Sequence, residues 1–426
     1  MSGTIKIEFE QFRLANGLRV IVAPDPTVPL VAVNLWYNVG SRNERPGRTG
    51  FAHLFEHMMF QGSQNVGVNA HFSLIEQAGG SLNGSTWLDR TNYFETLPAH
   101  YLELGLWLEA DRMGWLLPAM TQEKLDNQRD VVKNERRWRV DNQPYGDWDE
   151  RLQALVYPED HPYHHSVIGS MADLDAASLE DVEAFFRTYY APNNAVLTLA
   201  GDVTAERARP LVERYFGEIP AGPPVPPLPG VTDIPTVLPE ARSETVEQDI
   251  SLTRIFVAAR IPPFGEDGFY AASVASSILG DGRSALLYRR LVRTGIAQDV
   301  AAFAFPIVVG AAMLVVWATA APGVSRETLE KELLSAYDSL ASVDDREVER
   351  AVALLEAENL RALQRVEDRA DRLSMYATLF DDPGMINTEI DRIRGVTKAA
   401  VREIARKHLG ADNRILLTYV PKGSHE

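Results

Sequence analysis

The chain has 426 residues, 45% hydrophobic and 24% charged, which suits two or three folded domains and excludes a collagen-like, low-complexity or wholly disordered protein. Acidic residues outnumber basic ones by 59 to 42, and the net charge of −17 disfavours nucleic acid as a partner. No cysteine is present, so disulfides, thiolate catalysis and Cys-ligated metals are excluded, and a bound metal must use histidine, carboxylate or water.

The N-terminal residues set an expectation about location. The first 20 residues lack the basic segment and the continuous apolar run of a secretory signal. We therefore expect a cytoplasmic protein, or a periplasmic one if a signal peptide has been removed.

The first half of the chain predicts strands at both ends with helices between them. Residues 9–22 alternate in polarity around Asn16-Gly17, a dipeptide typical of a hairpin turn. Further strands are expected at 31–37 and at 195–201, and the stretch between these two is mainly helical in pattern.

A proline-rich segment, residues 219–240, divides the chain almost in half. Its eight prolines forbid helix and favour an extended connector. After it the same order of elements recurs. The expected elements are a strand at 251–260, a helix at 268–279, a hairpin within 300–322, helices within 325–363 and a strand at 414–420.

This recurrence predicts an α+β fold with two homologous domains. We assign residues 1–218 to an N-terminal domain, 219–240 to the linker and 241–426 to a C-terminal domain. Each domain is expected to contain a mainly antiparallel sheet with helices packed on one face.

Residues 300–322 carry no charge, so a membrane span is one interpretation of them. Pro306 and Gly310 interrupt the run, which is rich in Val, Ile, Phe and Ala, and this favours two buried strands joined by a turn. We therefore predict no membrane span. The charged stretch 343–373 is heptad-like in places, but it is more typical of packed helices with a solvated face than of a coiled coil.

The strongest chemical signal is His53-Leu-Phe-Glu56-His57. On a helix, residues i and i+4 share one face, so two imidazoles can bind one zinc ion. Glu56 would lie beside the ion, where a carboxylate can take a proton from the attacking water and pass it to a leaving amine. Apolar neighbours bury the helix and make unpaired polar groups costly, which argues against a merely structural role.

Zinc also needs a third protein ligand. Glu135 is the best candidate, because it shares a helical face with Leu125 and Gln128. Spacing alone leaves other acids open as well. These are Glu109, Asp111 and Asp130.

The motif His53-x-x-Glu56-His57, with 77 residues between His57 and Glu135, resembles the pitrilysin (insulinase) family of zinc peptidases. Size and the two α+β halves are similar to its processing-peptidase-like subfamily. Further matching segments cover most of the chain. They are Gly79–Thr86 with Asp89–Tyr93, His161–Tyr163 with Ile168-Gly169, Tyr190–Asn194 with Gly201-Asp202, and Gly280–Ser284.

The resemblance implies roles for particular residues. His53, His57 and Glu135 become the ligands of one Zn²⁺ per chain, and Glu56 becomes the general base. An edge strand within 83–88 would bind the substrate as an added strand through backbone hydrogen bonds. The residues implied in substrate binding are Asn83, Gly84, Ser85 and Thr86.

Two positions depart from the family pattern. Gln128 stands where many members have a second glutamate that tunes the metal ligands, so the charge is lost there. Gln298 ends the run Gly295-Ile-Ala-Gln298, where many self-sufficient members have a tyrosine that contacts the developing oxyanion. Arg290 and Arg293 lie nearby, but neither can be assigned to the arginine that accompanies this tyrosine.

These departures suggest that the chain is the zinc-bearing subunit of a heterodimeric peptidase that cleaves unfolded peptides in a closed chamber. A homologous partner without the zinc motif would supply the missing Arg and Tyr. The alternatives are a self-sufficient homodimeric peptidase and a non-catalytic assembly subunit that retains the fold.

Two further motifs have weaker functional interpretations. Gly280-x-Gly282-x-x-Ala285 fits a loose dinucleotide fingerprint, but it follows a helical segment where a strand is required. His161, His164 and His165 could form a second metal site, yet Pro162 places them on an irregular loop, which favours surface or supporting roles.

Overall fold

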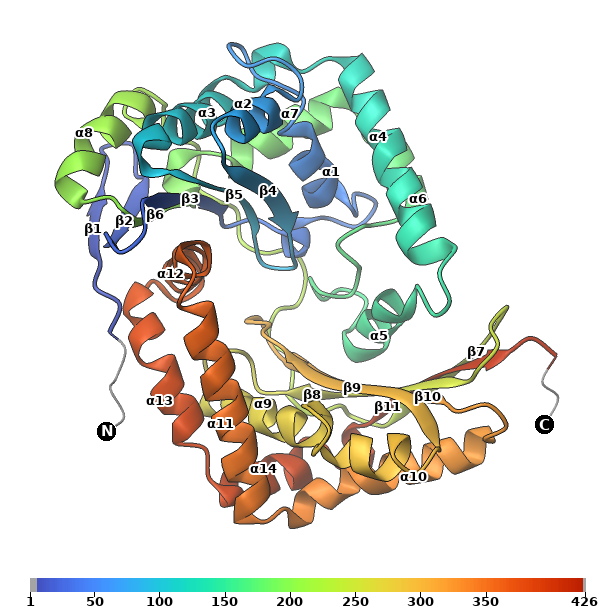
Figure 1. Cartoon of the computed structure of the whole chain (residues 1–426). Coiled ribbons are helices and arrows are strands. Elements are labelled where there is room, and N and C mark those ends of the chain that lie inside the picture. The colour runs from blue at the N-terminus through green and yellow to red at the C-terminus, as the bar shows by residue number, and fades with distance from the viewer. Residues whose placement is uncertain (1–5, 424–426) are drawn as a thin grey trace. The chain divides into compact units, whose positions relative to one another are not determined.

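The structure is a computed structural model that describes residues 6–423 (Figure 1). Its residues form two compact units, each built around one sheet. Unit 1 comprises the described residues of Met1–Glu135, Ser166–Pro229 and Leu360–Thr388. Unit 2 comprises those of Arg136–His165, Gly230–Asn359 and Glu389–Glu426.

The sheet of unit 1 has six strands in the order β1-β2-β6-β3-β5-β4. All neighbours are antiparallel except β2 and β6, which run parallel. The short strand β4 lies at one edge of this sheet. The strands are β1 (Glu10–Arg13), β2 (Arg19–Pro24), β3 (Leu30–Tyr37), β4 (Ser81–Thr86), β5 (Thr91–Pro98) and β6 (Ala195–Gly201).

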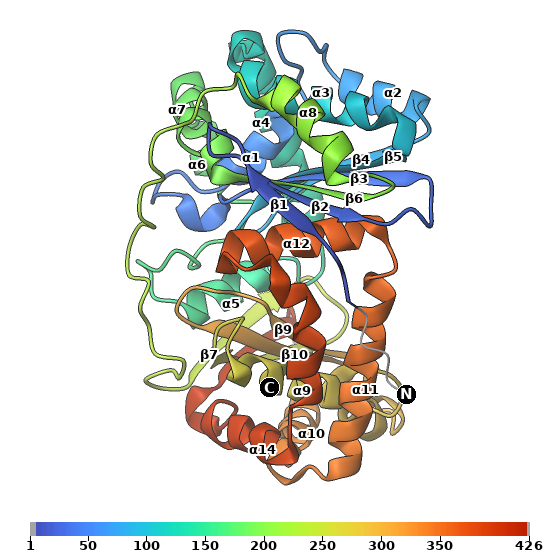
Figure 2. The same cartoon turned by 90° about the vertical axis from the view of Figure 1, so that its left-hand side faces the viewer.

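Helices cover both faces of this sheet. On one face Val33 and Leu97 lie against Gly105 of α3 (Leu102–Trp115) within the apolar core. On the other face Trp36 donates to Asp371 of α12 (Val366–Phe380), and Figure 2 shows α12 on the side of the sheet opposite α1, α3 and α8. The other helices of the unit are α1 (Phe51–Met58), α2 (Ala70–Gln77), α4 (Gln122–Arg136), α6 (Met171–Asp175), α7 (Leu179–Tyr189) and α8 (Ala205–Phe216).

The sheet of unit 2 has five strands in the order β7-β11-β8-β10-β9, and only β7 and β11 are parallel. Trp148 of α5 (Trp148–Val156) stacks on Phe256 with ring centroids 5.2 Å apart, whereas Gly280 of α9 (Asp267–Gly280) lies against Ala302. The strands are β7 (Arg242–Gln248), β8 (Arg254–Ile261), β9 (Ala297–Phe305), β10 (Ala312–Ala320) and β11 (Ile415–Pro421). The remaining helices are α10 (Arg326–Asp338), α11 (Asp345–Ala362), α13 (Glu389–Arg394) and α14 (Lys398–Lys407).

The α+β fold with two mainly antiparallel sheets is confirmed. Without β1, the two sheets have the same order, and each has its single parallel pair at the same place. The predicted hairpin within 300–322 is also confirmed, since β9 and β10 pair with Phe305 opposite Met313. Among residues 6–423, no helix combines the length and the apolar character needed to cross a bilayer.

The compact units differ from the predicted ranges 1–218 and 241–426, because each half of the chain contributes a segment to the other unit. Helix α5, from the first half, belongs to unit 2, and helix α12, from the second half, belongs to unit 1. These two exchanged helices are the reason that each sheet has helices on both faces and not on one face alone.

Candidate metal centre

Helix α1 carries the His-x-x-Glu-His motif, and its start is held by backbone contacts and by Glu44. Gly50 precedes the helix with φ = +85°, and a Cβ there would lie 2.6 Å from the carbonyl oxygen of Ile168, so only glycine fits. The buried Glu44 carboxylate accepts from Gly50 N at 2.9 Å and from Ala52 N at 2.7 Å. Both bonds satisfy N–H groups at the helix start, where they have no partner within the helix.

The apolar side of α1 fixes the direction of its polar side. Five residues are buried in the core of unit 1, and the polar residues His53, Glu56 and His57 remain partly accessible on the other side. The buried set is Phe51, Ala52, Leu54, Phe55 and Met58.

Helix α4 brings Glu135 to the same place. Thr121 Oγ1 accepts from Lys124 N at 3.2 Å and caps its first turn. Leu125 and Val132 bury one face of the helix, and Glu135 continues this face one turn after Val132.

The three side chains converge on one point. Glu135 Oε2 lies 3.3 Å from His57 Nε2 and 3.7 Å from His53 Nε2, and the two imidazole rings are 4.9 Å apart. Donors about 2.1 Å from a tetrahedral zinc ion are separated by about 3.4 Å. Two imidazole nitrogens and one carboxylate oxygen at these separations therefore fit zinc. Among residues 6–423, they form the one group of three or more acids and histidines with the spacing of a metal site.

Glu56 lies beside this group and next to strand β4. A Cβ built on Gly84 would be 3.3 Å from Glu56 Cγ. Burial raises the pKa of Glu56 above its usual range, although the hydrogen bond from Thr86 and the charges of His57 and Arg90 lower it. A carboxylate with a raised pKa is suited to accept and release a proton near neutral pH.

Strand β4 presents its free edge beside Glu56. Trp87 N donates to Arg90 O at 2.9 Å, and antiparallel bonding alternates along the strand, so the backbone groups of Leu82, Gly84 and Thr86 face away from β5. In agreement, Gly84 N donates to Asn83 Oδ1 at 2.9 Å instead of to β5. This edge is open to an added strand.

Two family models match this chain. The family model "Insulinase (Peptidase family M16)" matches residues 19–159, and the model "Peptidase M16 inactive domain" matches residues 176–355. The chain belongs to the insulinase family, peptidase family M16. It is a member of the pitrilysin-type zinc metallopeptidases.

Three similar proteins illustrate this membership. The chain is 29% identical to "Zinc protease PqqE" of Helicobacter pylori over 391 residues, which cover 88% of this chain and 85% of that protein. It is 28% identical to "Mitochondrial-processing peptidase subunit beta" of Blastocladiella emersonii over 49% of this chain and 44% of that one. A crystal structure of a protease from Helicobacter pylori superposes with a TM-score of 0.91 at 25% identity, covering 98% of this chain and 100% of that chain.

The other acids considered as ligands in this M16 peptidase are engaged elsewhere or lie outside the group. Glu109 pairs with Arg112 in the core, with Oε2 3.0 Å from Nε. Asp111 accepts from Asn65 Nδ2 at 2.6 Å and from Ser63. Asp130, on α4, is not part of the converging group.

Gln128 and Ser85 form hydrogen bonds with residues outside the metal group. Gln128 is buried on α4, where its amide nitrogen donates to Asn127 Oδ1 at 2.9 Å and to no zinc-ligand candidate in the described part of the chain. Ser85 Oγ donates to Asn92 Oδ1 at 2.7 Å, on the face of β4 opposite Glu56. At the free edge, a peptide would therefore bond to the backbone of Gly84 and Thr86, the neighbours of Ser85, and not to Ser85 itself.

The weaker motifs of the M16 peptidase have structural roles. His161 stacks on Tyr157 at 4.8 Å, and His164 Nδ1 lies 3.0 Å from Tyr157 O, so these histidines do not gather into a second metal group in the structure described for residues 6–423. The glycine motif at 280–285 follows helix α9 and no strand, which does not match a dinucleotide fold. Arg290 donates to Ser335 O at 3.1 Å.

Sequence reasoning gave no role to two residues near the centre, Glu44 and Arg90. Glu44 is six residues before Gly50, a separation with no helical or strand periodicity, so no pattern indicates that it caps α1. Arg90 stands in the matched segment Asp89–Tyr93 and acts on Glu56 through its charge. Only the fold brings either residue to the site.

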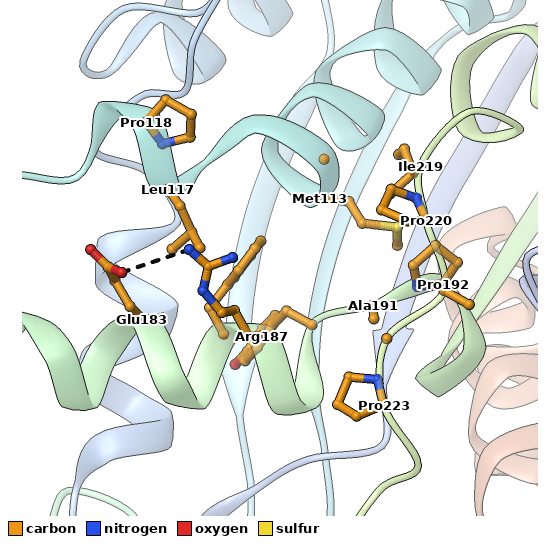
Figure 3. A pocket seen from close by; sticks show the side chains of 15 residues that line it. Met113, Leu117, Pro118, Glu183, Arg187, Ala191, Pro192, Ile219, Pro220 and Pro223 are labelled. Atoms are coloured by element: carbon orange, nitrogen blue, oxygen red, sulfur yellow. Dashed lines mark ion pairs between the residues drawn. The ribbon is translucent and has the colours of Figure 1, made fainter.

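A separate pocket of about 610 Å³ lies where the end of α3, the end of α7 and the segment 219–223 meet (Figure 3). Its walls are mostly apolar, with Met113, Ile219 and several prolines, and Arg187 pairs with Glu183 at 3.8 Å on one side. None of the predicted site residues lines this pocket.

Proposed function

We propose that this M16 peptidase is a zinc-dependent endopeptidase that hydrolyses unfolded peptides. His53, His57 and Glu135 would hold one zinc ion per chain, and Glu56 would act as the general base. The observation that carries the proposal is the convergence of these three donors, 3.3 and 3.7 Å apart, beside a partly buried glutamate.

The chemistry that zinc supplies when bound is polarisation of the scissile carbonyl and of the attacking water. Glu56 accepts the proton of that water and delivers it to the leaving amine. Its position serves both steps, because Glu56 lies one residue before His57 on the same helix, beside the proposed ligands. Helix α1 keeps Glu56 and the two histidines in register, since all three belong to one helical turn.

The substrate would add to the sheet of unit 1 at the edge of β4. Outward backbone groups of Leu82, Gly84 and Thr86 offer hydrogen bonds to any extended peptide, whatever its side chains. Asn83 Oδ1 occupies Gly84 N in the structure, so Asn83 would turn aside to let a substrate carbonyl replace it. An unfolded peptide can present an extended backbone with free hydrogen-bonding groups, whereas most such groups of a folded protein are already paired.

We further propose that the chain is the catalytic subunit of a heterodimer that encloses its substrate in a chamber. A similar protein is named as a subunit of a processing peptidase, and Gln298 stands where self-sufficient relatives are expected to have a tyrosine. A homologous partner without the zinc motif would supply the Arg and Tyr.

Zinc content and peptide cleavage test the core of the proposal. We expect one zinc per wild-type chain, Glu56→Gln with zinc retained and turnover lowered about 10²–10⁴-fold, and His57→Ala with zinc lost. Glu76→Gln and His100→Ala, at exposed positions, serve as matched controls and should behave as wild type. Zinc-free wild-type chain, or normal cleavage by Glu56→Gln, would show that the proposed chemistry is wrong.

Co-expression with a homologous subunit that lacks the motif tests the heterodimer. Activity that appears only in the mixed complex supports it. Full activity of the chain alone as a homodimer would establish the self-sufficient alternative, and zinc-free, inactive complexes would indicate a non-catalytic assembly subunit.

A further inference from the structure

Strand β4 has contacts on both of its faces, and only the contacts on the α1 face belong to the metal centre. On the α1 side, Gly84 lies against Glu56, and the Thr86 hydroxyl donates to the carbonyl oxygen of Ala52 on α1 at 3.5 Å. The opposite side of β4 rests on polar residues whose contacts lead to helix α12. Apart from the charge of Arg90, which acts on Glu56, this second support has no part in the chemistry proposed above.

The contacts on that side centre on Asn92, a buried residue of β5. Its Oδ1 accepts from Ser85 Oγ at 2.7 Å and from Arg90 Nη1 at 3.1 Å. Arg90 Nη1 also donates to the carbonyl oxygen of Ser85 at 2.7 Å, and its guanidinium lies 5.4 Å from the ring centre of Trp36. Asn92 and Arg90 together therefore hold both the side chain and the backbone of Ser85.

Asp371 of α12, together with a longer contact from Asn34 Oδ1 at 3.5 Å, determines which way the Asn92 amide points. Asp371 Oδ1 accepts from Asn92 Nδ2 at 3.0 Å, from Trp36 Nε1 at 2.8 Å and from Asn34 Nδ2 at 3.4 Å. Because the amide nitrogen of Asn92 faces this carboxylate, its oxygen must face Ser85 and Arg90. If the amide turned over, its NH₂ group would face the Arg90 cation, and the support of β4 would be lost.

We propose that Asp371 is a positioning residue for the substrate strand: through Asn92 and Arg90 it holds β4 at its place beside Glu56. This inference rests on the proposed function of β4 as the strand to which peptides add. Helix α12 comes from the second half of the chain, which contributes none of the zinc-ligand candidates. Residues after the proline-rich segment thus contribute to peptide binding within unit 1.

The test uses the full-length zinc-loaded protein and a quenched fluorogenic peptide. For Asp371→Ala we expect unchanged zinc content, kcat within about threefold of wild type and KM raised about tenfold, which corresponds to about 1.4 kcal/mol. Hydrogen–deuterium exchange of residues 81–86 should become faster, because β4 loses its support while α1 keeps its cap. Asp371→Asn retains an acceptor oxygen, so about a threefold rise in KM is expected. This variant also covers the case in which the alanine variant fails to fold.

Asp368→Ala is the matched control. Asp368 lies one turn earlier on α12 and pairs with the exposed Arg365 at 2.7 Å, so its loss should change neither KM nor exchange. Wild-type KM and wild-type exchange of 81–86 in both Asp371 variants would overturn the proposal, as would a fall in zinc content and kcat at unchanged KM. A wild-type chain without zinc or cleavage would instead defeat the proposed function, and the exchange measurement would still decide the role of Asp371.

Discussion

Replacement of Glu44 by alanine tests how the zinc helix is held. Glu44 is 4% exposed, and its two carboxylate oxygens accept separately from Gly50 N and Ala52 N at the start of α1. Gly50 has no side chain with which to cap the helix itself. His53 follows directly after the capped N–H of Ala52, so fraying of the first turn would displace a predicted metal ligand.

The size of the effect follows from the two bonds. A hydrogen bond to a charged group contributes about 1.5–3 kcal/mol to stability. Burial opposes this, because it raises the pKa of Glu44 well above its usual range even though the backbone donors of α1 lower it. We expect Glu44→Ala to lower the free energy of unfolding by about 2–4 kcal/mol. In a unit of about 200 residues this amounts to roughly 5–15 °C in the midpoint of thermal unfolding.

Thermal unfolding and zinc titration of the purified variant measure this prediction. Zinc affinity should fall about tenfold or more, because part of the free energy of zinc binding is then used to order the first turn of α1. Glu76→Ala removes an exposed glutamate from α2 and provides the control. If Glu44→Ala melts within 2 °C of this control and binds zinc equally well, the cap does not hold the helix and the reasoning fails.

Three further predictions concern single groups. Burial lowers the pKa of His71 to about 3, so its contribution to stability is complete above pH 6.5 and declines as pH falls. Between pH 7 and pH 5, the free energy of unfolding in urea should fall by about 2 kcal/mol more in wild type than in His71→Gln. An equal fall in both proteins would contradict this. Gly84→Ala should retain zinc but slow peptide cleavage because its Cβ would crowd Glu56, whereas Gly67→Ala, whose Cβ meets nothing within 4 Å, should cleave normally. Chelation should lower the thermal midpoint of wild type, added zinc should restore it, and His57→Ala should show no such shift.

The metal group was predictable to different degrees from the sequence. His53 and His57 lie four residues apart on one helix, so local geometry alone places their nitrogens together. Glu135 comes from a different helix, and its helical face favoured it only weakly over other acids such as Glu109 and Asp111 until the family resemblance singled it out. The structure gives the physical reason for the distinction, since the other two acids are used by Arg112 and Asn65.

Two strands had no clear sequence signal, and burial explains why. Strand β5 lies between β3 and β4 with both faces covered, and it buries the polar residues Asn92 and Glu95, so its hydrophobic pattern is broken. Strand β7 is half exposed along its length and consists mainly of charged and polar residues. Hydropathy identifies a strand only where buried positions are apolar and exposed positions are polar. The buried positions of β3 and β10 are mostly apolar, so these two strands are identified.

Helix α12 shows why the exchange of segments between units is hidden from hydropathy. The sheet face that it covers carries Asn34, Asn92 and Thr198, which need hydrogen-bond partners more than apolar cover. Asp371 and Ser374 meet that need, the latter with its hydroxyl 2.8 Å from Thr198 Oγ1. A helix that packs through hydrogen bonds has polar contact residues, so its sequence resembles that of a solvent-exposed helix. Residues 1–218 alone therefore do not form a complete unit 1. Without α12, the polar groups of this sheet face lose their hydrogen-bond partners, and Asn92 loses the contact with Asp371 that orients it beside the substrate strand.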